Sequence, residues 1–271
     1  MMSNIDFKEW NNAFRKLRYR HDTWYIFRDF LDMTIDNFTI PDQTPLFENR
    51  DKYTTEEYTY FGELFSAYMK GMQTELEKRP YCDFLGEWWE ADQDMTNKFN
   101  AQFFTPMQVA DLMCQLTLDK SMGEEPKVMY DCCCGSGRFG LAHHYYRPQD
   151  YFFFNDLDGY AVKMTVLNML VHGMRGVVAH MNTLTEEVFW CCQVTPFLYE
   201  YGGVPYVVPF GSDIRGALSM LPHGSSVVEA ASVNTIDSDN INTIDSDNIN
   251  TIDSDNREHT NKNKGVLDGW L

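Results

Sequence analysis

Apolar and aromatic residues recur every three or four positions in the first third of the chain, which is the spacing of one face of a helix. The pattern predicts helices within residues 3–34 and from about residue 55 to residue 78. The adjacent Trp88 and Trp89 are expected to be core residues rather than a base-stacking platform. We therefore expect a helical N-terminal domain over residues 1–98.

Further along, the pattern changes to short apolar runs separated by helical segments. The runs at residues 128–131, 150–158 and 177–180 predict strands, and a helical pattern over residues 160–171 lies between the last two. Strands that alternate with helices indicate a parallel sheet covered by those helices. We therefore expect an α/β domain over residues 99–232.

The most informative stretch runs from Val128 to Gly140, where an apolar strand ends on Asp131 and breaks into closely spaced glycines. Gly135 and Gly137 let the backbone bend sharply and approach a ligand without a Cβ in the way. The helix that follows would present free N–H groups to that ligand. The stretch predicts a strand-to-helix turn that holds a nucleotide-like molecule.

Two kinds of ligand fit this turn. Gly135, Gly137 and Gly140 satisfy the Gly-x-Gly-x-x-Gly dinucleotide pattern, which is a weak signal by itself and would indicate a nicotinamide-dependent oxidoreductase. The carboxylate of Asp131 argues against a pyrophosphate, because like charges repel, and favours a ligand that carries a positive charge. S-adenosylmethionine carries an ammonium and a sulfonium group.

Two motifs carry a family resemblance. Asp131-Cys-Cys-Cys-Gly-Ser-Gly137 resembles the Asp-Pro-x-Cys-Gly-Ser-Gly cofactor motif of adenine-N6 DNA methyltransferases, especially the modification subunits of type I restriction systems. Cys132 stands where those proteins usually have proline. Gln102-Phe-Phe-Thr-Pro106 resembles the Gly-Gln-Phe/Tyr-Phe-Thr-Pro element that precedes the cofactor motif in the same family. The two motifs in the family's order are far more specific than either alone.

The resemblance implies a Rossmann-like S-adenosylmethionine-dependent methyltransferase domain, preceded by the helical domain of modification subunits. In that family the Phe-Thr-Pro element packs over the methionine end of the cofactor, which would place it beside Asp131. The ribose-binding acid would be Asp156, about 20 residues past the glycine loop. Asp158 is the competing candidate, unless it caps the next helix. The family's adenine-contacting position falls on Asn182, for which an ordinary turn residue is an equally good interpretation.

The resemblance also leaves the chemistry unassigned. The family holds the target amine with Asn/Asp/Ser-Pro-Pro-Phe/Tyr/Trp, whose aromatic ring stacks on a flipped-out base, and no Pro-Pro dipeptide occurs in this sequence. Thr195-Pro196-Phe197 and Val208-Pro209-Phe210 each lack the acceptor and the second proline, so neither is assigned as catalytic. The implied cofactor-binding residues are Phe104, Thr105, Pro106, Asp131, Cys133, Gly135, Gly137, Asp156 and Asn182.

The predicted sheet is short for this family. From Lys127 to Val208 there is room for about four strands, fewer than a complete methyltransferase sheet needs. No recognisable target-reading domain follows. An incomplete methyltransferase domain is therefore part of the expectation.

An eight-residue unit, Asn-Thr-Ile-Asp-Ser-Asp-Asn-Ile, repeats between Asn234 and Asn256. Its aspartates lack the loop glycine and terminal glutamate of an EF-hand, and its few isoleucines cannot build a core. We expect residues 233–271 to form a disordered tail.

The charge balance shapes the expected partners. The formal net charge is −18, of which the repeats explain only a part. Because nucleic-acid binding relies on lysine and arginine, a protein this acidic would need another subunit to hold DNA. We expect DNA as a partner, through a specificity subunit. Five basic residues of the first helical segment are expected on a solvated helix face rather than against nucleic acid: Lys8, Arg15, Lys16, Arg18 and Arg20.

Seven cysteines, an odd number with adjacent runs, do not suit a disulfide framework and favour reduced thiols in a cytoplasmic protein. The runs Cys132–Cys134 and Cys191–Cys192 lack the ligand spacing of a zinc site, so no metal is expected. No uninterrupted apolar segment of about 20 residues is present, so we expect no membrane span.

Three functions remain open at this point. The first is methylation of adenine N6 in DNA from S-adenosyl-L-methionine, as in restriction-modification systems. The second is a catalytically degenerate module that binds the cofactor or only a protein partner. The third is a nicotinamide-dependent oxidoreductase. The motifs support cofactor binding more strongly than they support catalysis.

Overall fold

The computed structural model describes residues 5–40, 43–47, 52–92, 104–118, 123–196 and 205–222. Three parts of the sequence predictions lie outside the described residues: the predicted tail, Gln102 and Phe103 of the Gln102–Pro106 motif, and Phe197. In the described part of the chain, no helix has the length and apolar character needed to cross a bilayer.

The N-terminal part is helical, as the sequence predicts. Its helices are α1 (Lys8–Arg18), α2 (Thr23–Asn37), α3 (Thr55–Leu76) and α4 (Phe84–Ala91). The first predicted helical stretch is divided into α1 and α2 because Asp22 starts a new helix, its side chain accepting the Trp24 N–H at 2.9 Å. Thr54 and Glu57 cap α3 reciprocally.

The second part is a five-stranded sheet with strand order β1-β2-β3-β4-β5. Strands β1 (Val128–Asp131), β2 (Tyr151–Asp156) and β3 (Gly176–Asn182) are parallel, whereas β4 (Glu187–Pro196) and β5 (Pro205–Gly211) continue antiparallel. The α/β class predicted from the sequence is confirmed, with a sheet that is mixed rather than parallel. The remaining helices are α6 (Met107–Thr117), α7 (Arg138–Tyr146), α8 (Gly159–His172) and α9 (Ile214–Ser219).

The sheet has more strands than the sequence predicts, and it changes direction. The sequence predicts about four strands, whereas the described chain forms five, and the last two run antiparallel. The turn between β3 and β4 is too short for the crossover that parallel strands need, so β4 folds back beside β3.

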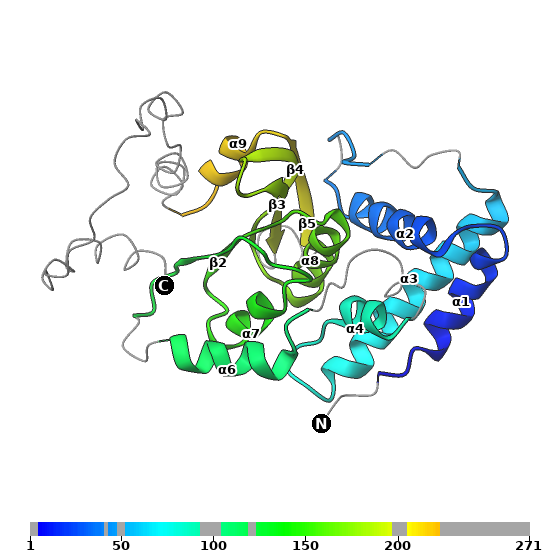
Figure 1. The fold of residues 1–271 in the computed structure, drawn as a ribbon, viewed down its shortest axis with the longest axis horizontal. Coiled ribbons are helices and arrows are strands. Elements are labelled where there is room, and N and C mark those ends of the chain that lie inside the picture. Colours follow the sequence, from blue (N-terminus) through cyan, green and yellow to red (C-terminus); the bar gives the residue numbers. More distant parts are fainter. Residues whose placement is uncertain are drawn as a thin grey trace, which may run out of the picture.

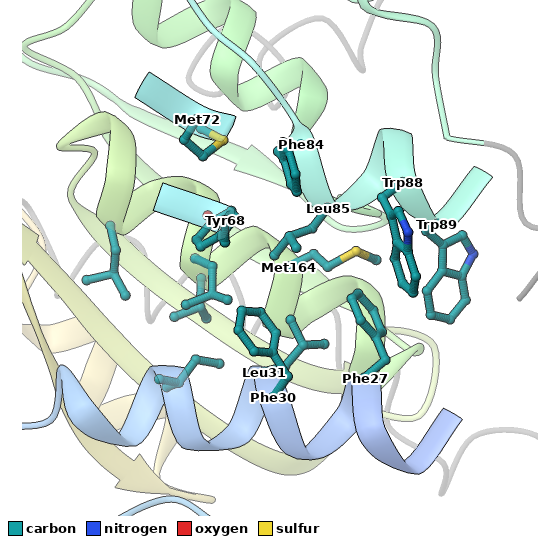
Figure 2. Packing of buried hydrophobic residues seen from close by; sticks show 14 of the residues in the cluster. Phe27, Phe30, Leu31, Tyr68, Met72, Phe84, Leu85, Trp88, Trp89 and Met164 are labelled. Atoms are coloured by element: carbon teal, nitrogen blue, oxygen red, sulfur yellow. The ribbon is translucent and has the colours of Figure 1, made fainter. Parts of the chain in front are cut away.

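One aromatic cluster joins the helices to the sheet. Figure 2 shows Phe27 of α2 beside Trp88 of α4 and Phe30 of α2 pointing toward Tyr68 of α3, with Met164 of α8 between the layers. The same cluster continues to Phe154 of β2. Although α1–α4 gather on one side of the molecule and the sheet on the other (Figure 1), the two parts therefore share a core.

Backbone contacts strengthen this junction. The residues after α2 pair with the outer strand β5: the Val207 N–H donates to the Phe38 carbonyl at 2.8 Å, and the Ile40 N–H donates to the Val207 carbonyl at 3.2 Å. On the opposite face of the sheet, α9 packs Leu218 against a smaller cluster that includes Phe153. Predicted domains 1–98 and 99–232 thus meet through both side chains and backbone.

Candidate cofactor-binding site

Two carboxylates lie at neighbouring strand ends. Asp131 ends β1 and Asp156 ends β2. Because the two strands are parallel neighbours, both side chains lie at the end of the sheet where these strands have their carboxyl ends. Burial raises the pKa of Asp131 above its ordinary value; a hydrogen bond from the Cys133 N–H opposes this, and the charge of Asp156 adds to it. A positively charged ligand would relieve this concentration of negative charge.

The glycine loop follows β1 directly and needs its glycines. Gly135 and Gly137 have φ values of 56° and 85°, in the left-handed region that disfavours residues with a Cβ. A Cβ on Gly135 would also lie 3.0 Å from Cδ1 of Phe104. The ring of Phe104, from the Gln102–Pro106 motif, therefore packs on the glycine loop of the Asp131–Gly137 motif.

A cleft of about 180 Å³ opens at the carboxyl ends of β1 and β2. It is smaller than the roughly 300–1,000 Å³ of a typical small-molecule pocket, so it would enclose only part of a nucleoside-sized ligand. Six of the nine residues implied by the family resemblance line it: Phe104, Thr105, Asp131, Cys133, Gly135 and Asp156.

Three implied residues are not in the lining. Pro106 precedes the first residue of α6, and Gly137 occupies the corresponding position before α7. The side chain of Asn182 accepts the backbone N–H groups of Leu184 and Thr185 at 3.0 and 3.3 Å. In this structure Asn182 thus has the role of a turn residue.

Asp156, the last residue of β2, and Asp158, two residues later, have different roles. Asp158 caps α8, accepting the N–H groups of Tyr160 and Ala161 at 2.8 and 2.9 Å. Asp156 lines the cleft and accepts the Gly135 N–H at 2.8 Å. A carboxylate already occupies this loop N–H, which a phosphate would otherwise use, and its charge opposes a phosphate.

Some residues of the lining were missed by the sequence analysis. They are Cys134, Ser136, Arg138, Phe139 and Ala161. Arg138 is the most connected of them, and its acidic partners lie about 50 residues earlier in the chain, in and next to α4. No local pattern could have identified it, because the spacing between these partners carries no periodic signal.

The described residues of the two proline–aromatic pairs lie away from the cleft, Phe197 being outside the described part of the chain. Pro196 ends β4, and Pro209 and Phe210 lie within β5, the strand at the opposite edge of the sheet from β1. With strands about 4.8 Å apart, β5 lies about 14 Å from β2 across the sheet. Neither pair contributes to the described lining.

The cysteines form no disulfide, and all seven are free thiols. Burial raises the pKa of Cys133, and the adjacent Cys132 raises it further. Within the described ranges, no group of three or more histidine, cysteine, aspartate or glutamate residues is arranged to hold a metal ion.

Comparison with known proteins identifies the segment that contains this cleft. Residues 83–197 match the family model for N-6 DNA methylases. The resemblance to adenine-N6 DNA methyltransferases is thereby confirmed for this segment, which we call the methylase segment. It begins at Asp83, just before α4, and includes both strand ends and the glycine loop.

A solved structure is also similar to this chain. It is the type I restriction-modification system methyltransferase subunit from Streptococcus thermophilus, with 22% sequence identity and a TM-score of 0.33. The alignment covers 63% of this chain and 37% of that subunit, so this chain spans well under half of the subunit's length. No curated protein matches the chain.

Proposed function

We propose that the methylase segment binds S-adenosylmethionine in the cleft at the ends of β1 and β2. The observation that carries the proposal is the pair of carboxylates, Asp131 and Asp156, beside a glycine loop in a segment that matches N-6 DNA methylases. Two negative charges suit a cationic cofactor and oppose the pyrophosphate of a nicotinamide dinucleotide.

The described residues fit such a cofactor. Asp131 would attract its ammonium group, Asp156 would accept hydrogen bonds from its ribose, and Phe104 would cover one side. The bare backbone of Gly135 leaves room for close approach. When bound, the cofactor supplies an electrophilic methyl group on its sulfonium. We further propose that adenine N6 in DNA receives this methyl group, through a specificity subunit that holds the DNA.

A second candidate is a protein that binds the cofactor without transferring its methyl group. The position of Pro196 and Pro209 in β4 and β5, remote from the cleft, favours it. Catalysis would need a polar acceptor beside the target amine, because the amine's lone pair is delocalised into the ring. The described lining offers no proline–aromatic pair for that purpose.

Calorimetric titration with S-adenosylmethionine tests the proposal, with NADH as the comparison ligand. We expect micromolar binding of S-adenosylmethionine alone, and loss of binding in Asp131→Ala. Asp213→Asn is the control, because Asp213 is exposed and is not in the cleft lining, and asparagine can still accept the Gly216 N–H that Asp213 caps at the start of α9. Unchanged affinity in Asp131→Ala, or tighter binding of NADH, would remove the assignment.

Methyl transfer is a separate measurement. Labelled cofactor incubated with DNA, with and without a specificity subunit, should transfer label if the protein is an adenine methyltransferase. Binding without transfer under both conditions would leave the second candidate.

A further inference from the structure

One wall of the cleft is held by an ionic network whose two acidic members lie outside the cleft lining. Arg138 follows the glycine loop, and its guanidinium donates to the Thr105 carbonyl from Nη1 at 3.3 Å. The guanidinium carbon also lies 5.3 Å from the centre of the Phe104 ring. One side chain therefore contacts both residues of the Phe-Thr wall that faces the loop.

Two acids hold Arg138 in this position. Asp83 accepts from Nε at 2.6 Å, and Glu90 accepts from Nη2 at 2.8 Å. Burial acts to lower the pKa of Arg138, but the charges of Asp83 and Glu90 outweigh it and raise the pKa, so the guanidinium stays charged. Neither acid contributes to the lining of the cleft.

Glu90 makes a second contact with the same wall. Its Oε1 accepts the backbone N–H of Phe104 at 3.2 Å, while its Oε2 binds Arg138. The wall is thus fixed at the Phe104 N–H, at the Phe104 ring and at the Thr105 carbonyl. Because the ring packs on Gly135, displacement of this segment would change the shape of the cleft.

Asp83 anchors the other side of the network. It is fully buried and also accepts from the Ser136 hydroxyl at 2.6 Å and from the Asn168 amide at 2.9 Å. Asp83 is thus a partner of the glycine loop, of α8 and of Arg138 together. The helix that follows it, α4, is itself fixed in the aromatic cluster by Trp88 (Figure 2).

We propose that Glu90 and Asp83 are positioning residues for the cofactor cleft, holding Phe104 and Thr105 against the glycine loop through Arg138. The proposal rests on the proposed function for the identity of the ligand. It makes cofactor affinity depend on α4, a helix that contributes no residue to the described lining of the cleft.

Glu90 offers the sharper test, because its side chain is 31% exposed. Asp83 is fully buried, and its loss would leave Arg138 Nε without its acceptor. Glu90→Ala removes both contacts. Glu90→Gln keeps an acceptor for the Phe104 N–H but loses the charge opposite Arg138. Glu87→Gln is the matched control, because Glu87 pairs with Arg79 one turn earlier on α4 and does not reach the cleft.

Affinity for S-adenosylmethionine should fall about tenfold in Glu90→Ala and about threefold in Glu90→Gln, while Glu87→Gln binds as the unsubstituted protein does. The midpoints of thermal unfolding of Glu90→Gln and Glu87→Gln should agree. An unchanged affinity in both Glu90 variants, in a protein that binds the cofactor, would overturn the proposal and leave the proposed function standing.

A measurement without ligand separates the two ideas. Amide hydrogen exchange over residues 104–110 and 133–137 should quicken in Glu90→Ala and stay unchanged in Glu87→Gln. Faster exchange in a protein that binds no S-adenosylmethionine would support the positioning role and refute the proposed function. Unchanged exchange in Glu90→Ala would refute the positioning role whatever the protein binds.

Discussion

The helical region and the glycine-loop edge of the sheet are held together by different forces. In the helical region, Trp10, Phe30 and Trp88 are almost fully buried and contact one another or their neighbours edge to face. At the loop edge, short polar contacts among Asp83, Ser136 and Arg138 fix the backbone. The first region can tolerate only changes of similar volume, whereas the second depends on charge and on missing Cβ atoms.

The largest expected effect concerns packing. Trp88→Ala should lower the free energy of unfolding by about 3–5 kcal/mol, because it leaves a cavity in the aromatic cluster. The substitution also removes the indole N–H that donates to the side chain of Asn11. Urea denaturation measures the change. Tyr19→Ala, at a side chain that is 89% exposed, should stay within about 0.5 kcal/mol, and a similar loss there would contradict the contrast.

The next effect concerns charge in the sheet. Asp150 is buried before β2, and although burial would raise its pKa, bonds from His143, Arg147 and the Lys127 N–H lower it to about 2. Asp150→Asn should cost about 3 kcal/mol at neutral pH, because Arg147 loses its buried carboxylate.

The pH dependence of that variant has a defined sign. A lowered pKa stabilises the folded protein above the ordinary value near 4, and this stability is lost as the pH falls from about 4 to 2. The difference between Asp150→Asn and the unsubstituted protein should therefore shrink over that range in urea denaturation. A difference independent of pH would show that packing, and not charge, holds this position.

A smaller effect distinguishes two glycines. Gly135→Ala should cost about 1–2 kcal/mol, because it strains a left-handed residue and crowds Phe104, and cofactor affinity should fall about tenfold. The same change at Gly62, on the exposed face of α3 with nothing near its Cβ, should stabilise by about 0.5–1 kcal/mol. Thermal unfolding and calorimetric titration check both. An equal change in stability at Gly135 and Gly62 would show that the left-handed conformation and the contact with Phe104 do not set the cost at Gly135.

The smallest effect lies at the junction of the two regions. Burial raises the pKa of Asp36 to about 6, although its carboxylate accepts the Leu46 N–H at 3.1 Å. The folded protein therefore binds a proton more tightly than the unfolded chain, and stability falls as pH rises from about 4 to 6. Asp36→Asn should raise stability by about 1 kcal/mol at pH 8, after allowance for solvent screening, and by much less near pH 4. A stabilisation equal at both pH values would rule out the ionisation of Asp36 as its cause.

Local patterns were enough to predict several elements of both regions. Helical spacing identified α3, and the apolar runs before Asp131 and Asp156 identified β1 and β2. Parallel strands bring their carboxyl ends to one edge, so the placement of these two acids followed from the strand assignment. The burial of Trp88 and Trp89 also agrees with the prediction.

Other features depend on contacts between distant residues. The spacing of residues did not predict the partners of Arg138 or the antiparallel return of β4. For Asp158 the sequence left both a ligand contact and a helix cap open, and the fold places it as the cap of α8. Asn182 illustrates the same point. Its position in the sequence suits either a ligand contact or a turn, and in the folded chain its side chain accepts the backbone N–H of Leu184.

The sequence thus specified the periodic elements and the chemistry at strand ends, because both arise from residues that are close in the chain. Only the folded chain decided which side chains share the cleft and what holds them there. The physical reason is that a buried charge such as Arg138 must be paired with acids that packing brings to it. Here packing brings Asp83, the residue before α4, and Glu90 of α4, which lie about 50 residues earlier in the chain.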